Sequence, residues 1–342
     1  MPAEATLEWF GATTYRIRAN GLTILHDAWF DRPSGWPKYL TADQAGEVDY
    51  IVISHAHFDH LPGAEKVALR TGAIIIANCE AINRLREFGL QEDQLLPVAG
   101  GERIPLFTKD IWAKAKRKEI ELAPAPPLAP PKPHGKYAAM DVHVWPSLHA
   151  LMPPLADVPD YFDTGKSYVG PAGPYDCTLD ITRNMQYGLF RLHDFIPPDH
   201  MDEGLRAVAD YFQERKSMPM SHCDGGQLLY NFLLGPDKVL LFNSHLGAYD
   251  GILNSITPKP NHVILGFGGR ANLNGRPYNG SAAEFLTMEV NLLGQPATVW
   301  PCLHDRSIIR PYGVITGPAE EMIAAKTKSQ VILPEPKKVY IL

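Results

Sequence analysis

The chain has 342 residues, of which 45% are hydrophobic, and carries a formal net charge of -6. This length and apolar content predict a large core in one domain, with or without an insertion, while the acidic balance disfavours a nucleic-acid partner. No apolar run approaches the roughly 20 residues that span a bilayer, no signal peptide opens the chain, and the four cysteines are scattered, so we expect a cytoplasmic protein without disulfides.

The N-terminal section alternates short apolar segments with turns. Residues 7–11 and 14–18 predict paired strands, and the dipeptide Asn20-Gly21 predicts the turn into a further strand. After a buried strand over 48–53, the pattern predicts a helix that begins near residue 61, a strand over 71–77 and a helix over 79–88. This alternation of strands and helices predicts an α/β fold.

The most informative segment follows the predicted buried strand directly. Residues 54–60 read Ser-His-Ala-His-Phe-Asp-His and place three imidazoles and a carboxylate within six positions. In an extended segment His55 and His57 point the same way, and Asp59 and His60 can face a second point once the chain turns. Imidazole with carboxylate suits zinc, and also iron or manganese. The segment therefore predicts a site for one or two metal ions at a sheet edge.

This H-x-H-x-D-H pattern resembles the metallo-β-lactamase superfamily. The resemblance implies that residues 1–342 form a single αββα sandwich of two mixed β-sheets flanked by helices. The strand that ends at Asp27 is similar to the branch that includes ascorbate-6-phosphate lactonase and N-acyl phosphatidylethanolamine phospholipase D. By that resemblance Asp27 would accept a proton from a ligand imidazole and fix its tautomer. An ordinary turn aspartate is the alternative.

The middle of the chain holds three unusual stretches. Lysines and arginines over 105–120 fit a solvated helix face. Residues 123–134 predict an extended proline-rich arm, which could reach a second subunit of a homodimer. Residues 140–149 predict a strand that runs into a loop. We expect residues 151–222 to form an insertion that acts as a lid or an interface.

The resemblance also implies the remaining metal ligands, which stand at later strand ends. His149 matches the third ligand of the first metal, and His304 matches the last ligand of the second. The family's bridging aspartate has no counterpart, because His245 or, in another register, Ser244 or Asn243 stands there. An imidazole binds one ion and cancels no charge. We therefore expect weaker binding of one of the two ions.

The second half also predicts a late helix and candidates for substrate binding. A strand over 225–232 and a helix over 281–293, with a capping box at its start, precede a strand expected over 297–305. Arg270, Asn272 and His222 are the candidates for orienting a small-molecule substrate. A guanidinium fork suits carboxylate or phosphate.

Together these residues predict a metal-dependent hydrolase. A metal ion can activate water for attack on a carbonyl carbon or a phosphorus, and Asp59 could orient that water or take its proton. We expect a small ester or lactone-like substrate; a phosphodiesterase, a di-iron redox enzyme and a non-catalytic ligand-binding relative are the alternatives. The expected ligands are, for the first ion, His55, His57 and His149; for the second, Asp59, His60 and His304; and near both, His245.

Overall fold

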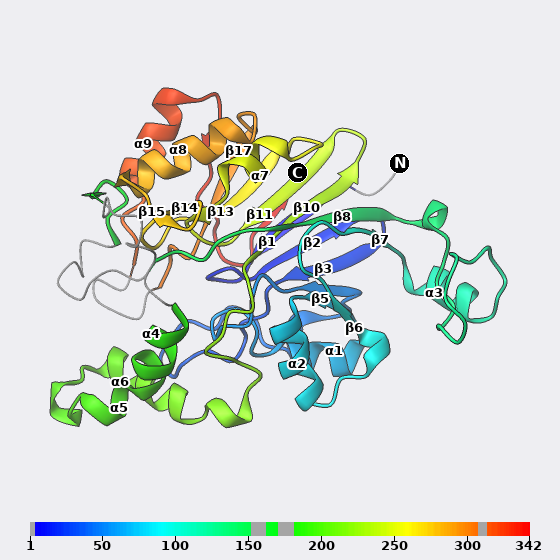
Figure 1. The fold of residues 1–342 in the computed structure, drawn as a ribbon, viewed down its shortest axis with the longest axis horizontal. Coiled ribbons are helices and arrows are strands. Elements are labelled where there is room, and N and C mark those ends of the chain that lie inside the picture. Colours follow the sequence, from blue (N-terminus) through cyan, green and yellow to red (C-terminus); the bar gives the residue numbers. More distant parts are fainter. Residues whose placement is uncertain (1–3, 152–161, 170–180, 307–312) are drawn as a thin grey trace.

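Two seven-stranded mixed sheets form the centre of the molecule (Figure 1). The computed structural model describes residues 4–151, 162–169, 181–306 and 313–342. The first sheet contains, in spatial order, β19 (Val339–Ile341), β1 (Thr6–Trp9), β2 (Tyr15–Ala19), β3 (Leu22–His26), β4 (Tyr50–Val52), β5 (Ile74–Ala77) and β6 (Leu95–Pro97). The second contains β18 (Gln330–Val331), β17 (Thr298–Cys302), β13 (His262–Gly266), β11 (Lys238–Asn243), β10 (Leu228–Gly235), β8 (Met140–Pro146) and β7 (Arg103–Leu106).

Each sheet is antiparallel at one side and parallel at the other. Strands β19 to β3 and strands β7 to β11 pair antiparallel, whereas β3 to β6 and β11 to β18 pair parallel. Side chains that alternate along the strands fill the space between the sheets, as the fully buried Ile17 and Ile24 of the first sheet and Val142 and Phe232 of the second show. The predicted sandwich of two mixed sheets is confirmed.

Helices cover the outer faces of both sheets. Apolar residues of α1 (Ala64–Thr71) and α2 (Cys79–Glu87) pack on the first sheet. Those of α8 (Ala282–Leu292) and α9 (Gly317–Lys326), with α7 (Asp250–Ser255), pack on the second. These layers complete the αββα architecture. Short pairings add a three-stranded sheet and a two-stranded one, made of β12 (Gly247–Ala248), β14 (Asn272–Leu273) and β15 (Arg276–Pro277), and of β9 (Ser167–Tyr168) and β16 (Gly280–Ser281).

Local signals place several element ends as expected. Asn20 and Gly21 both have positive φ, at 51° and 79°, in the turn between β2 and β3. Helix α8 begins at the predicted capping box, in which Ser281 and Glu284 bond each other's backbone N–H.

Three expected strand ends are wrong by three residues each. The strand expected from residue 71 begins at residue 74, because α1 continues to Thr71 and Gly72 closes it in the left-handed conformation. The strand expected from residue 225 begins at residue 228, after two glycines with positive φ. The strand expected over 297–305 ends at Cys302, where Leu303 adopts φ 52°.

A group of short helices packs beside the motif loop of residues 54–60. It comprises α4 (Ile181–Tyr187), α5 (Leu192–Phe195) and α6 (Glu203–Gln213), at the lower left of Figure 1. Phe58 joins the two parts, because its ring lies 4.9 Å from that of Phe212 and its carbonyl accepts a hydrogen bond from Tyr211 at 3.2 Å. Residues 152–161 and 170–180 of the expected insertion lie outside the described residues.

The basic stretch projects from the opposite side of the molecule (Figure 1). It includes α3 (Lys109–Lys116), whose Lys109 and Lys114 pair with Glu47 and Asp110 at 2.7 Å, as a solvated helix face does. The proline-rich arm that follows is largely exposed and holds one isolated bridge, Leu122 to Pro133. Its role in a homodimer stays a prediction. Across the described segments, no helix is long and apolar enough to cross a membrane.

Candidate metal centre

The sheet topology brings distant imidazoles to one edge of the sandwich. Strands β8 and β11 both pair antiparallel with β10, so they run in the same direction and end at the same edge. His149 follows β8 and His245 follows β11. In the other sheet, β3 and β4 run parallel, so that Asp27 and the motif loop also share an edge.

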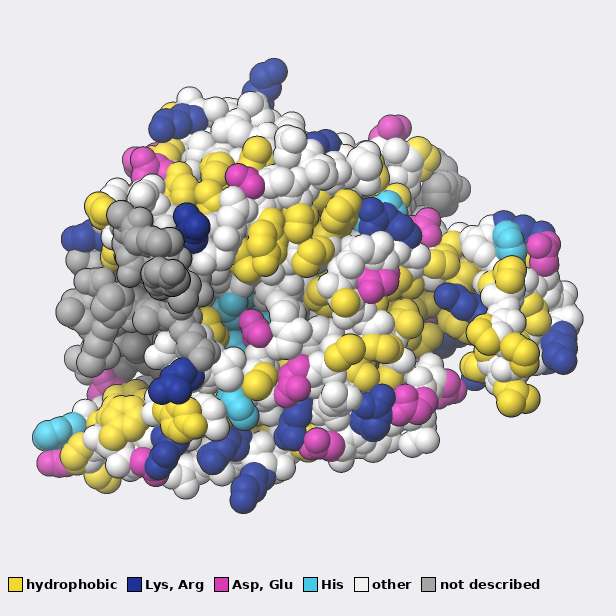
Figure 2. Space-filling view, viewed as in Figure 1, with side chains coloured by type: hydrophobic (Ala, Val, Ile, Leu, Met, Phe, Trp, Pro, Cys, Tyr) yellow, Lys and Arg dark blue, Asp and Glu magenta, His cyan; other side chains and the backbone are white. Residues whose placement is uncertain are grey.

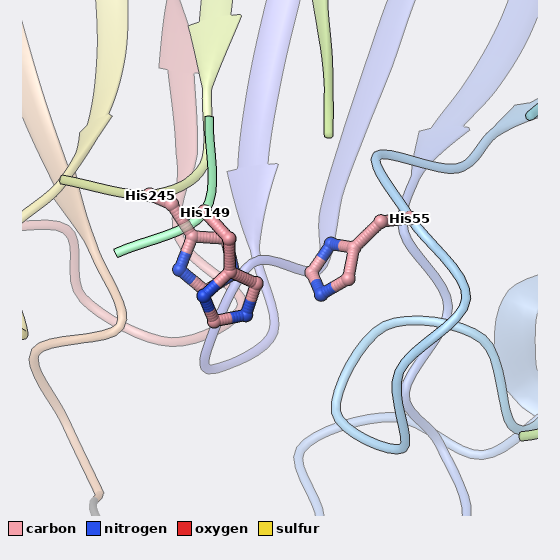
Figure 3. A group of neighbouring side chains, drawn as sticks. All are labelled: His55, His149 and His245. Carbon is pink, nitrogen blue, oxygen red and sulfur yellow. The ribbon is translucent and has the colours of Figure 1, made fainter. Parts of the chain in front are cut away.

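Three imidazoles from these loops face one another in Figure 3. The rings of His149 and His245 stack with centroids 3.9 Å apart, and the ring of His55 lies 5.0 and 4.9 Å from them. One ligand atom from each of the three lies within 4.8 Å of the others. His57 joins this group through its Nδ1, which is 3.2 Å from Nε2 of His149.

A second group overlaps the first and shares His55. It consists of His55, Asp59 and His60, whose ligand atoms also lie within 4.8 Å of one another. Nε2 of His60 is 3.4 Å from a carboxylate oxygen of Asp59 and 3.3 Å from Nε2 of His245. Burial raises the pKa of Asp59, but the adjacent imidazoles, His60 foremost, outweigh it and lower the value to about 2.

The buried nitrogens of this cluster fit a cation. His55 Nε2, His57 Nε2 and His245 Nδ1 are buried and have no hydrogen-bond partner. Burial, with neighbouring imidazoles, holds the pKa of each of these histidines well below the usual value, so the rings are neutral and carry a lone pair. Because an unpaired buried polar atom is costly, several such atoms in one cluster are explained by a metal ion that accepts their lone pairs.

A hydrogen bond to Asp27 orients the imidazole of His60. Its fully buried carboxylate accepts hydrogen bonds from His60 Nδ1 at 2.7 Å and from the Ser54 backbone N–H at 2.8 Å. A proton fixed on Nδ1 makes Nε2 the atom through which His60 would bind a metal. Burial lowers the pKa of His60, but Asp59 and Asp27 outweigh it and raise the value to about 10, so Nε2 must give up its proton for a metal to bind there. Ser54 Oγ adds a bond to the same carboxylate at 2.9 Å. No role for Ser54 was predicted from the sequence. Its position directly before His55, the first expected ligand, could have indicated one.

Only one of the three candidates for the bridging position lies in the imidazole cluster. Asn243 donates to Glu289 at 2.8 Å and to the Gly247 carbonyl at 3.0 Å, away from the histidines. The hydroxyl of Ser244 lies 3.4 Å from Nε2 of His26, a buried ring stacked on Phe242. The ring of His245 contacts His149 and His60, so His245 is the candidate that the geometry favours.

His304 lies apart from both groups of three. Strand β17 runs parallel to β13 and β11 and delivers His304 to the same edge. Its ring stacks on Trp9 with centroids 4.9 Å apart, and its Nδ1 is buried without a partner. Neither group of potential ligands within 4.8 Å includes it, so its role as a ligand stays a prediction.

Each of the three substrate candidates lies on a segment that contacts a segment bearing a proposed ligand. Arg270 pairs with Leu151 by a backbone bridge close to His149, and its guanidinium lies over the ring of Tyr168 at 5.2 Å. The side chain of Asn272 donates to the carbonyl of His149 at 3.0 Å. His222 follows Ser221, whose N–H donates to the carbonyl of Ala56 at 2.9 Å. Figure 2 shows histidine side chains at the bottom of a hollow in the molecular surface.

Sequence comparisons match the first part of the chain, and structure comparisons match the fold of the whole chain. Residues 7–150 match the family model described as the metallo-beta-lactamase superfamily. A protein of Anaeromyxobacter named UPF0173 metal-dependent hydrolase is 37% identical over 87 residues, which are 25% of this chain and 31% of that relative. A protein of the same name from Pyrobaculum calidifontis is 32% identical over 100 residues, 29% of this chain and 44% of that relative. The chain thus spans less than half the length of these relatives.

Two solved structures share the fold at low sequence identity. Igni18, named as a metallo hydrolase from Ignicoccus hospitalis, has a TM-score of 0.56 with 14% identity and covers 99% of both chains. CmlA, named as a diiron β-hydroxylase from Streptomyces venezuelae, has a TM-score of 0.51 with 13% identity and covers 100% of this chain and 55% of its own. At such identities the likeness describes the fold and leaves the chemistry to the site itself.

Proposed function

We propose that this chain, whose residues 7–150 match the metallo-β-lactamase superfamily, is a metal-dependent hydrolase that acts on a small ester or lactone-like substrate. The observation that carries the proposal is the set of buried, neutral imidazoles whose Nε2 or Nδ1 atoms have no hydrogen-bond partner. Nitrogen atoms in this arrangement support zinc as the metal, with iron and manganese as less suited alternatives.

The proposed ligands divide into a nitrogen-rich group and a group with one carboxylate. His55, His149 and His245 would hold the first ion, with His57 beside them, and Asp59 and His60 would hold a second. A histidine in place of a bridging carboxylate leaves the charge of two adjacent cations less compensated. We therefore propose that one ion binds tightly and the second binds weakly.

The chain's own residues would supply the positioning and the proton transfer. Zinc, when bound, would provide a Lewis acid and lower the pKa of a water molecule. Asp59, which stays ionised because neighbouring imidazoles lower its pKa, can accept a hydrogen bond or a proton from that water. Arg270 and Asn272 line the approach to His149 and could orient the substrate carbonyl.

Elemental analysis of the purified protein and of two His245 variants tests the metal centre. We expect close to one tightly held ion in the wild type and a lower metal content in His245→Ala, because a direct ligand should matter at least as much as the supporting residues whose loss costs about 10- to 100-fold in metal affinity. His245→Asp should restore a bridging carboxylate and raise the occupancy of the second ion. His143→Ala is the matched control, because His143 lies on β8, outside both groups of potential ligands. If all three variants keep the wild-type metal content, His245 is not a ligand.

A substrate panel tests the activity. Hydrolysis of esters and lactones that exceeds hydrolysis of phosphodiesters supports the proposal, and the reverse ranking would make the protein a phosphodiesterase. A protein that binds no metal and hydrolyses none of these compounds with added zinc, iron or manganese would refute hydrolase function and favour a ligand-binding relative.

A further inference from the structure

A cavity of about 480 Å³ lies among the short helices beside the metal centre. Its volume falls in the range of roughly 300–1,000 Å³ that small-molecule sites occupy. Residues from α4, α5, α6 and the adjoining 3-10 turns form most of its wall, and His222 closes the side that leads back to the motif loop. The metal chemistry described above uses none of the helical wall.

His222 connects the cavity with the metal centre. His222 lines the cavity, and the segment that carries it is bonded to Ala56 of the motif loop, whose N–H donates to the carbonyl of Asp224 at 3.0 Å. The neighbouring Ser221 N–H donates to the carbonyl of Ala56 at 2.9 Å, so this segment runs along the motif loop. The cavity therefore lies beside the segment that is bonded to the loop of the proposed ligands His55 and His57.

Aromatic packing holds the cavity wall against the same loop. Phe190 lines the cavity and stacks on Phe212 with centroids 4.8 Å apart. Phe212 in turn meets the ring of Phe58, in the metal motif, at 4.9 Å. The wall of the cavity is mostly polar, and Phe190, with the buried Leu192 and Ala209, gives it a smaller apolar floor. This floor suits a hydrocarbon chain or ring.

The cavity has one guanidinium without a carboxylate partner. Arg191 lies 2.5 Å from Asp194, a carboxylate that also lines the cavity. Arg215 is half-buried, and its Nη1 donates to the carbonyl of Phe212 at 2.9 Å. Among the residues with described positions, no carboxylate lies within ion-pair distance of Arg215. As far as the described residues go, the cavity thus combines an apolar floor with one guanidinium that has no carboxylate partner.

We propose that this cavity binds a carboxylate with an apolar body, whose acid group pairs with Arg215 and whose body lies on Phe190 and Leu192. A guanidinium binds a carboxylate through two parallel hydrogen bonds. This inference rests on the proposed hydrolase function. It narrows the substrate class to esters or lactones that carry a free carboxylate on an apolar chain. The carboxylate would stay in the cavity while the reacting carbonyl reaches the metal ligands.

Calorimetric titration with octanoate tests the site. Octanoate should bind the purified full-length protein, and the neutral analogue octanamide should bind at least about tenfold more weakly, because a charge-assisted hydrogen bond is lost. Arg215→Gln should weaken octanoate binding by about tenfold and leave octanamide binding unchanged. Arg215→Lys should keep part of the affinity. Arg206→Gln is the matched control, because Arg206 is exposed on α6 and does not line the cavity.

The comparison of octanoate with octanamide on the wild type stands even if Arg215→Gln folds poorly. Equal binding of the two compounds, no binding of octanoate, or unchanged octanoate affinity in Arg215→Gln would each overturn the proposal. The titration is repeated after chelator treatment, so that the result does not depend on a loaded metal centre. If octanoate binds through Arg215 but no ester or lactone is hydrolysed, the binding site stands and the proposed hydrolase function fails.

Discussion

Replacing Asp27 with Asn should reverse the tautomer of His60 and weaken metal binding. Asp27 accepts hydrogen bonds from the Ser54 N–H through Oδ1 and from His60 Nδ1 through Oδ2. An Asn side chain can still accept from the Ser54 N–H only if its oxygen faces Ser54, which turns its NH₂ group toward His60. Nδ1 of His60 must then accept, and the ring proton moves to Nε2, the atom that faces Asp59 and His245.

The cost of this reversal can be worked out from the contacts. Returning the proton to Nδ1 would place two donors against each other in a fully buried site, which costs about 1–3 kcal/mol. Since 1.4 kcal/mol corresponds to a factor of ten, we expect zinc affinity to fall about 10- to 100-fold, the usual effect of losing such a supporting carboxylate. The shape of the side chain is conserved, so the fold should persist.

Competition with a chelating dye measures the zinc affinity of Asp27→Asn, and nitrogen NMR of the imidazoles reports the tautomer of His60. Asp31→Asn is the matched control, because Asp31 pairs with Lys66 at 2.6 Å on the surface, away from the cluster. Unchanged affinity in Asp27→Asn, with the His60 proton still on Nδ1, would refute the reasoning. A variant that binds less zinc but also melts earlier than the control would indicate a general loss of packing instead.

Three further predictions concern stability. Phe58→Ala should lower the free energy of unfolding by about 3–5 kcal/mol in urea titrations, because it removes the ring that joins Phe212 to the motif loop; a loss no larger than that of an exposed-residue variant would contradict this. Removing the metal with a chelator should lower the melting temperature, since an ion that binds only the folded state at 100 times its Kd adds about 2.7 kcal/mol; an unchanged melting temperature would count against a bound ion. Burial raises the pKa of Glu289 in the folded protein well above its ordinary value of 4.5. The protein therefore keeps its full stability below pH 4.5 and loses stability as the pH rises toward the raised pKa, because the unfolded chain releases the proton first. Glu289→Gln keeps the oxygen that accepts from Asn243 and cannot ionise. The variant should therefore become more stable relative to the wild type as the pH rises from about 5 to about 8. A stability difference that stays constant over this range would show that Glu289 does not titrate there.

The proposed role of residues 54–60 could be predicted from the sequence because all its information is local. A buried strand followed by His55, His57, Asp59 and His60 places four ligand-type side chains within six consecutive residues, independently of the rest of the fold. The same holds for the capping box at Ser281, which depends on contacts three residues apart. Strand and helix order followed from apolar patterning, whereas element ends shifted where glycine or a left-handed residue closed the element.

The partners of those ligands depended on tertiary structure. His149 and His245 meet only because β8 and β11 both run antiparallel to β10, a pairing that no local pattern encodes. Spacing left Ser244 and Asn243 open beside His245, and only the packed structure turns their side chains to His26 and Glu289 instead. The sequence by itself thus indicated the resemblance to the superfamily, which residues 7–150 match, and the first half of the proposed metal centre. Long-range packing decided which imidazoles join it, because ligand geometry is a property of the assembled sheets.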